Sequence, residues 1–365
     1  MTTRSALLTE HQRLPTSGAR GVSLFELEGA LQLVIPQLAV DLLEQPPYMN
    51  GGDSDIGAPI YQWSEGAFAE EGDLPMPGGE DAEYFRIGDI DFLATASVRV
   101  GRSPYDLNTE SVLYRRREGA WLPFQRFPTF AAKQWHAFAI GDRHFLALAQ
   151  GVTVEGPIAR HPSRSCLFEW NGMQFVEFQI FDGRWGYNWA SFAIGGRHFL
   201  AYADHAGPSC LFEWDGAAFS PIQEFAPSGG RAYKYFEADG EIWLAFANLP
   251  GESVLFRWDG SRFSPHQTIG GPGGREFALI EGQQGLYLAL INFIHGTPAA
   301  PKTDLLSRIY RFEKGGLTEA MEFPTFGATD AASFAAEGQI YLAVSNSLTP
   351  AVRFREDSVI YRFLG

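Results

Sequence analysis

Ser165-Cys166-Leu167-Phe168-Glu169-Trp170 decides the fold of this chain, because the same pattern returns six more times. The pattern is a Ser, two apolar residues, an aromatic residue, a polar residue and a second aromatic residue. The other copies lie at 209–214, 253–258, 307–312 and 358–363, with weaker copies at 58–63 and 111–116. Their starts are about 44 to 54 residues apart, a spacing typical of propeller blades rather than of short solenoid repeats.

Each repeat can be divided into four short strands, and the fourth repeat shows them most clearly. Residues 190–194 and 199–203 flank the turn Gly195-Gly196, and paired glycines permit the positive φ of a two-residue hairpin. Residues 209–214 and 219–225 supply the second pair of strands. The sequence therefore predicts an all-β protein, a seven-bladed β-propeller whose blades are four-stranded antiparallel sheets.

The two ends of the chain are predicted to meet in the last blade. The seventh repeat ends just after its third strand, at Leu364-Gly365, whereas the start of the chain resembles the fourth strand at 175–181. We therefore expect residues about 5–14 to supply the outer strand of the blade formed by about 330–365. Such closure removes exposed sheet edges, and it predicts a single β-propeller domain over residues 1–365.

The repeats resemble the EAR repeat, also called EPTP, which is found in the leucine-rich glioma-inactivated proteins and in stand-alone bacterial proteins. The segments 341–346, 358–363 and 326–330 carry the resemblance. The resemblance implies a seven-bladed interaction module. It also implies that calcium can be held in the central channel, without identifying the ligands residue by residue.

Composition narrows the classes of partner. The formal net charge of −15 argues against nucleic acid and against an anionic membrane, since both favour basic surfaces. No apolar run approaches the length of a membrane span, and no apolar signal segment follows Met1. Cys166 and Cys210 occupy the same position in neighbouring repeats, which places them too far apart for a disulfide. We expect free thiols and a cytoplasmic protein.

Loop lengths predict that one face carries the binding surface. In a four-stranded blade, the connections from strand two to three emerge on the same face as those from strand four to the next blade. The two-to-three connections are short in the fourth and fifth repeats and long in the other five: 38–57, 98–110, 151–164, 293–306 and 347–357. We expect a raised crescent with a notch, and a protein, peptide or small ligand bound on this loop-rich face.

Aromatic residues near the channel mouth are the predicted binding residues, because aromatics at a pocket mouth can anchor a partner or ligand. Seven of them are assigned to the four-to-one connections: Phe130, Trp135, Trp185, Tyr187, Trp189, Tyr233 and Phe326. Packing between blades is the alternative role for Trp135 and Trp189. Exposed aromatics also leave open a carbohydrate-binding propeller.

An enzyme with its site at the channel mouth is the main alternative to a binding scaffold, since propellers host hydrolases, lyases and cyclases. The scaffold is favoured because no catalytic motif appears in the sequence. Five residues could act as acids, bases or metal ligands: His136, His205, His295, Asp204 and Asp330. No cofactor is expected, and calcium is the ion left open, with Asp53, Asp55, Asp81 and Asp330 as its candidate ligands.

Overall fold

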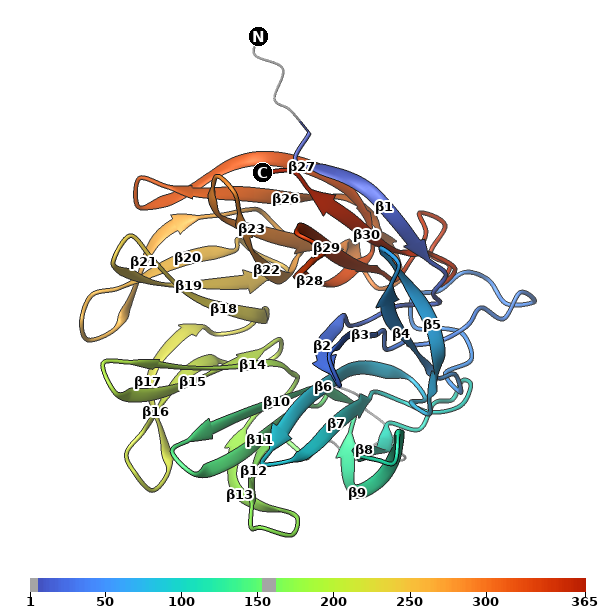
Figure 1. Ribbon diagram of the computed structural model, residues 1–365, viewed down its shortest axis with the longest axis horizontal. Coiled ribbons are helices and arrows are strands. Elements are labelled where there is room, and N and C mark those ends of the chain that lie inside the picture. Colours follow the sequence, from blue (N-terminus) through green and yellow to red (C-terminus); the bar gives the residue numbers. More distant parts are fainter. Residues whose placement is uncertain (1–5, 153–161) are drawn as a thin grey trace.

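Seven four-stranded antiparallel sheets surround a common axis in the computed structural model, which describes residues 6–152 and 162–365 (Figure 1). Every regular element in this part of the chain is a β-strand. The structure confirms the predicted seven-bladed propeller of four-stranded antiparallel blades. In this part of the chain, no helix is long and apolar enough to cross a membrane.

The first four blades follow one another along the chain, each with its strands in sequence order from the axis outward. Their strands are β2 (Ser23–Leu27), β3 (Ala30–Val34), β4 (Ala58–Ser64) and β5 (Ala67–Leu74); β6 (Gly79–Ile87), β7 (Ile90–Ser97), β8 (Asn108–Arg117) and β9 (Ala120–Phe130); β10 (Ala132–Ile140), β11 (Arg143–Gln150), β12 (Arg164–Trp170) and β13 (Phe175–Asp182); and β14 (Gly186–Ile194), β15 (Arg197–Asp204), β16 (Ser209–Trp214) and β17 (Phe219–Ala226).

The last three blades complete the ring, and the sixth carries an additional two-stranded hairpin in its two-to-three connection. Their strands are β18 (Gly230–Ala238), β19 (Glu241–Asn248), β20 (Val254–Trp258) and β21 (Phe263–Thr268); β22 (Gly274–Gly282), β23 (Gly285–Asn292), β26 (Asp304–Glu313) and β27 (Gly316–Phe326), with the hairpin β24 (His295–Thr297) and β25 (Ala300–Lys302); and β28 (Ala328–Ala336), β29 (Gln339–Asn346), β30 (Ser358–Phe363) and β1 (Leu8–Leu14).

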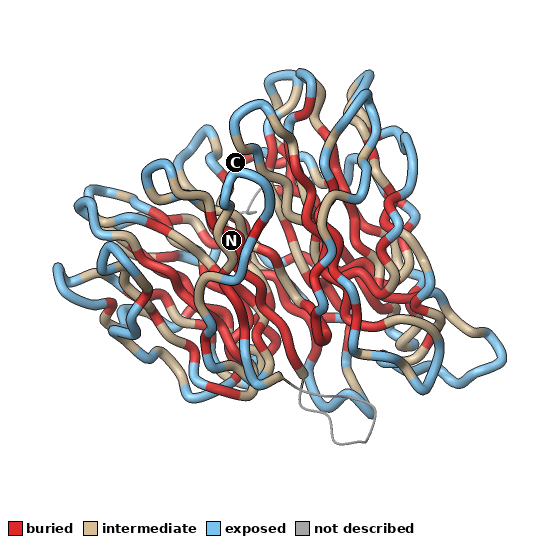
Figure 2. The backbone as a smooth tube through the Cα atoms, turned by 90° about the horizontal axis from the view of Figure 1, so that it is seen from below, coloured by how far each residue is buried: buried red, intermediate tan, exposed pale blue. Residues whose placement is uncertain are grey.

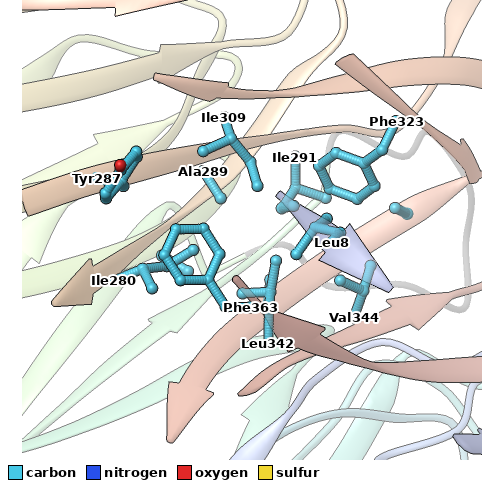
Figure 3. Close-up of a cluster of buried hydrophobic side chains, with 13 residues drawn as sticks. Leu8, Ile280, Tyr287, Ala289, Ile291, Ile309, Phe323, Leu342, Val344 and Phe363 are labelled. Carbon is cyan, nitrogen blue, oxygen red and sulfur yellow. The ribbon is translucent and has the colours of Figure 1, made fainter. Parts of the chain in front are cut away.

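Closure of the ring by the N-terminal strand is confirmed. Strand β1 pairs antiparallel with β30, with Leu8 opposite Phe363 and Leu14 opposite Ser358, and the two strands lie side by side in Figure 1. The side chain of Leu8 is 7% exposed and packs into the core between the sixth and seventh blades, near Phe323 and Val344 (Figure 3). The closing strand therefore contributes both a hydrogen-bonded edge and an apolar contact.

The first strands differ from the predicted ones in length. In the fourth blade, β14 begins at Gly186, four residues before the predicted start at Ala190. The other three strands of this blade match the prediction to within two residues. The early start of β14 cannot be recognised from the sequence, because a β-bulge between Gly186 and Asn188 interrupts the alternation of side chains.

Aromatic residues from these extended first strands fill the spaces between neighbouring blades. Trp135 of β10 and Trp189 of β14 are each 1% exposed. Trp135 packs against Phe127 of the second blade, and Trp189 packs against Phe181 of the third blade, with ring centroids 5.0 Å apart in both pairs. Figure 2 shows the resulting pattern, with buried residues along the strands and exposed residues at the turns. These rings hold the blades together.

The connections have the predicted lengths where the structure describes them. Asp204 to Ser209 and Asn248 to Val254 are short, whereas the corresponding segments of the other blades are long. Residues 153–161 of the third blade's connection lie outside the described residues. Cys166 and Cys210 are free, as expected.

Candidate functional site

A cavity of about 970 Å³ opens on the loop-rich face around the propeller axis. We call it the loop-face cavity. Its rim comes from two-to-three connections, including Tyr48, Tyr105 and Pro298, and from the four-to-one connection that carries Trp185. This volume lies at the upper end of the range found for small-molecule sites, about 300–1,000 Å³.

The floor of the cavity is built from one repeat position. In six blades, a β-bulge at the start of the first strand leaves one residue out of the strand pairing, and Arg20 precedes β2 at the equivalent place, next to Ala19, which bridges to Gln37. Bulges often re-aim side chains near functional sites. We name the seven residues the basal ring: Arg20, Glu80, Lys133, Tyr187, Arg231, Arg275 and Thr329. All of them except Thr329 line the loop-face cavity.

Five of the seven basal-ring residues are buried, Lys133 and Tyr187 are half-buried, and the ring carries an excess of positive charge. Arg20, Arg231 and Arg275 are 8%, 4% and 7% exposed, and Glu80 is 5% exposed. Oxygens of Glu80 lie 3.1 Å from Nη2 of Arg275, 3.7 Å from Nε of Arg20 and 3.8 Å from Nζ of Lys133. One carboxylate thus faces three cations. Although burial opposes its ionisation, these cations hold the pKa of Glu80 below its usual value.

Tyr187 places an aromatic ring among the remaining charges. The guanidinium carbons of Arg231 and Arg275 lie 3.7 Å and 4.7 Å from its centroid, and Nζ of Lys133 lies 5.3 Å away. These distances fit cation–π contacts. Burial acts to raise the pKa of Tyr187, but the charges of Arg231, Lys133 and Arg275 outweigh it and lower this pKa.

Several polar atoms around the cavity make no hydrogen bond to any described residue. They are Nε of Arg20, Nε of Arg231, Nε1 of Trp185 and Nδ1 of His205, and all four are buried. Burial lowers the pKa of Arg231 to about 10, so this guanidinium stays charged at neutral pH. Burial, followed by the charge of Arg231, lowers the pKa of His205 to about 3, so this imidazole is neutral there.

Asp204 fixes the wall that carries Trp185. Its carboxylate accepts hydrogen bonds from the backbone N–H groups of Arg184, Trp185, Ala206 and Gly207, at 2.7 to 3.1 Å. The side chain is 0% exposed. Asp204 therefore joins two loops and positions Trp185, whose ring packs edge-on against His205 with centroids 4.8 Å apart.

The upper wall of the cavity is apolar. It is supported by a cluster of buried loop residues that includes Met49, Phe293 and Ile294. Phe130 belongs to the same cluster and is 3% exposed. The cavity thus combines a charged floor with an apolar wall.

A second cavity of about 540 Å³ lies along the axis on the other side of the basal ring. Five ring residues line both cavities, and the second cavity is otherwise lined by groups such as Glu83, His136 and Lys234. Burial raises the pKa of Glu83 to about 7. Burial, followed by the charge of Lys234, lowers the pKa of His136 to about 4.

Glu83, His136 and Ser191 follow one another in the order of an acid–His–Ser triad. Nε2 of His136 lies 2.9 Å from Oγ of Ser191, and Nδ1 lies 3.7 Å from Glu83. However, Nε2 also accepts the backbone N–H of Ser191, and Glu83 accepts the backbone N–H of Ala137 at the equivalent place one blade earlier. The repeated bond shows that this position links neighbouring blades.

A second row of inter-blade hydrogen bonds gives a structural role to two candidate site residues, Asp81 and Asp330. Asp81 accepts the backbone N–H of Trp135, and Asp330 accepts that of Val22, each at 2.8 Å. Gln134 and Asn188 make the same bond to the next blade. Burial raises the pKa of both Asp81 and Asp330, the latter to about 6.

The proposed calcium ligands do not assemble into a site. Asp53 pairs with Arg102, and Asp55 accepts the backbone N–H of Gly101. Asp81 and Asp330 serve the inter-blade bonds. Among the residues that the structure describes, no group of three or more His, Cys, Asp or Glu side chains could hold a metal ion. The donor set therefore does not fit calcium.

The structure brings together only some of the predicted site residues. Trp185, Tyr187, His205 and His295 line the loop-face cavity. His136 and Asp330, two of the groups considered for an enzyme site at the channel mouth, line the second cavity instead. The five predicted acid, base or ligand groups are thus divided between two cavities and the Asp204 turn.

Several predicted binding aromatics lie elsewhere. Trp135, Trp189 and Tyr233 are in strands rather than connections, and at 1%, 1% and 3% exposure they offer no ring surface to a partner. Phe130 supports the cavity wall from behind. Phe326 ends β27, is half-buried and borders a separate small cavity. For Trp135, Trp189 and Tyr233 the correction follows from the longer first strands, which place these residues in the core between blades.

The basal ring itself was missed. A signal was present, because a small residue precedes a basic one at, or just before, the start of four first strands: Ala19-Arg20, Ala132-Lys133, Gly230-Arg231 and Gly274-Arg275. Aligning the repeats column by column would have grouped these four residues. Nothing in one repeat alone indicates that they converge, because the convergence comes from the ring.

Comparison with known proteins agrees with the repeat. The family model for the EPTP domain matches residues 174–215, 218–259 and 321–364. The human protein named thrombospondin-type laminin G domain and EAR repeat-containing protein is 27% identical over 200 residues, covering 53% of this chain and 27% of that one. Its mouse counterpart is 27% identical over 208 residues, covering 55% of this chain and 28% of that one. The chain spans little more than a quarter of the length of these relatives.

Among solved structures, the fold is similar to that of the SapL1 lectin in complex with alpha methyl fucoside. The TM-score is 0.45 and the sequence identity is 12%, with 73% of this chain and 88% of that chain covered.

Proposed function

This protein is an EPTP/EAR-repeat β-propeller, and we propose that it is a binding protein that holds its ligand in the loop-face cavity. The observation that carries the proposal is the cavity itself, because a charged floor and an apolar wall meet in a space of about 970 Å³. Such a combination of apolar lining and a few convergent polar groups is typical of ligand sites. The division of the predicted acid–base residues between two cavities favours binding over chemistry.

Native mass spectrometry of protein purified gently from its source tests this function. We expect a retained ligand in the wild type and its loss in Leu249→Trp, which places a large side chain on the cavity wall. Leu122→Trp is the matched control, because Leu122 is 47% exposed on β9, away from the cavity. Equal retention by both variants would locate the ligand elsewhere and overturn the proposal.

A further inference from the structure

We propose that the loop-face cavity recognises an organic anion, in which a carboxylate, sulfonate or phosphate group is attached to an apolar body. The acidic group would bind the arginines of the basal ring, and the body would lie against the apolar wall. The inference rests on the proposed function, since it names the ligand class of the same site.

Local charge is the first argument. The described residues lining the cavity include one acid, Glu80, and five basic residues: Arg20, Arg99, Lys133, Arg231 and Arg275. The whole protein has a formal net charge of −15. A positive site inside a negatively charged protein is a localised feature, and such a focused potential attracts anions.

The contacts of these basic side chains show that most of their charges are not neutralised within the protein. Nη2 of Arg275 is the one basal-ring cation atom within hydrogen-bond distance of Glu80, at 3.1 Å. Arg99 binds neutral oxygens, namely Oγ of Ser54 and the backbone carbonyls of Asn50 and Gly51. Arginine keeps its proton when buried. At least three of the four guanidinium groups in the cavity therefore carry a positive charge that the single carboxylate, Glu80, does not neutralise, and this charge can attract a ligand.

Unused donors are the second argument. Nε of Arg231 and Nε of Arg20 are buried without a hydrogen bond to a described residue, and these side chains are 4% and 8% exposed. A buried donor left without an acceptor is costly, about 1–3 kcal/mol. The oxygens of a carboxylate or phosphate would satisfy both donors. Planar guanidinium groups suit such oxygens, because they donate parallel hydrogen bonds.

The wall defines the rest of the ligand. Above the ring, the cavity is lined by apolar side chains that include Met49, Leu107, Leu249 and Phe293, together with the ring of Trp185. An inorganic ion would leave this surface in contact with water. An aromatic or aliphatic body would bury it and contribute about 25 cal/mol per Å² of apolar area.

Binding of three naphthalene probes by isothermal titration calorimetry tests the inference. The probes are 2-naphthoate, 2-naphthyl phosphate and the uncharged 2-naphthamide, which share one apolar body. We expect both anions to bind at least about tenfold more tightly than the amide, the difference expected from a charge-assisted hydrogen bond. Comparing the two anions shows which acidic group the site prefers.

Arg231→Gln should weaken binding of both anions by about tenfold or more and leave the amide unchanged. Arg257→Gln is the matched control, because Arg257 pairs with Glu241 on the outer part of the fifth blade. If Arg231→Gln folds poorly, the wild type still gives an answer. Raising the ionic strength should weaken anion binding and spare the amide, because salt screens charge.

The outcomes separate the two proposals. Equal affinity for the amide and the anions would overturn the anion inference and leave the cavity as a binding site. Absence of binding by all three probes would also overturn it, while retention of a protein or an uncharged ligand in the Leu249→Trp comparison would still support the proposed function.

Discussion

The guanidinium carbon of Arg231 lies 3.7 Å from the centroid of the Tyr187 ring, although the two residues come from neighbouring blades. Both occupy the bulge position of a first strand. The aromatic face stabilises the buried cation without neutralising it, because a ring offers a quadrupole rather than a charge. This contact allows a guanidinium to sit at the floor of a cavity and remain available to an anion.

Glu80→Gln should destabilise the protein by about 3–5 kcal/mol, because it removes the carboxylate that faces three buried cations. Sulfate should restore part of the melting temperature, and more than chloride does at equal ionic strength, since a bound anion stabilises the folded state. Glu110→Gln is the control, as its ion pair with Arg126 is exposed. Unchanged melting of Glu80→Gln would contradict this account of the ring.

The contribution of the closing strand β1 to stability can be tested by substituting one of its side chains. Leu8→Ala should lower the free energy of unfolding by about 2–5 kcal/mol, because Leu8 is buried between the last two blades. Leu364→Ala, at a position 48% exposed, should change it by less than about 0.5 kcal/mol. Deletion of residues 1–14 should lower the melting temperature further. Equal urea denaturation curves for the two point variants would argue against closure.

Substituting Trp185 and Trp189 in turn should distinguish a binding role from a structural role. Trp189→Ala should cost about 3–5 kcal/mol of stability, since its ring fills the space between blades. Trp185→Ala should cost much less, because Trp185 is half-buried on the cavity wall, but it should weaken binding of 2-naphthoate. A stable Trp189→Ala variant that fails to bind would reverse the assignment.

Stability should fall as the pH rises from about 6.5 to about 8. Burial raises the pKa of Glu83 to about 7, so the folded state holds this proton more tightly than the unfolded chain, and the stabilisation is lost as the pH passes about 7. Glu276 contributes in the same direction. His136 and His205 have lowered pKa values, so their contribution grows with pH only up to about 6.5.

Glu83→Gln should flatten this decline, because the amide oxygen can still accept the backbone N–H of Ala137 and does not ionise. Urea denaturation at a series of pH values measures the effect. If the unfolding free energy of the variant falls with pH as steeply as that of the wild type, then Glu83 is not the cause of the decline.

Removal of metal should leave the fold unchanged. The carboxylates of Asp53, Asp55, Asp81 and Asp330 accept hydrogen bonds from arginine or from backbone N–H groups. We therefore expect EDTA, and calcium added afterwards, to leave the melting temperature unaltered. A rise on adding calcium would reveal a site that these contacts do not explain.

The repeat and its closure could be predicted because they are local patterns that recur. Ser209–Trp214 has the same bounds in sequence and structure, and the turn at Gly195-Gly196 has positive φ at both residues. The bulge at Tyr187 could not be predicted in this way, because the extra residue breaks the period of two on which strand prediction depends.

The sequence by itself determined that seven blades form, that each has four strands, and that the N-terminal strand completes the last one. Only the tertiary structure decided where Arg20, Lys133, Arg231 and Arg275 meet. Residues more than 250 positions apart along the chain become neighbours at the axis when the ring closes. Their positive charges act together because ring closure makes them neighbours. The formal net charge of −15 gives no sign of this local excess of positive charge.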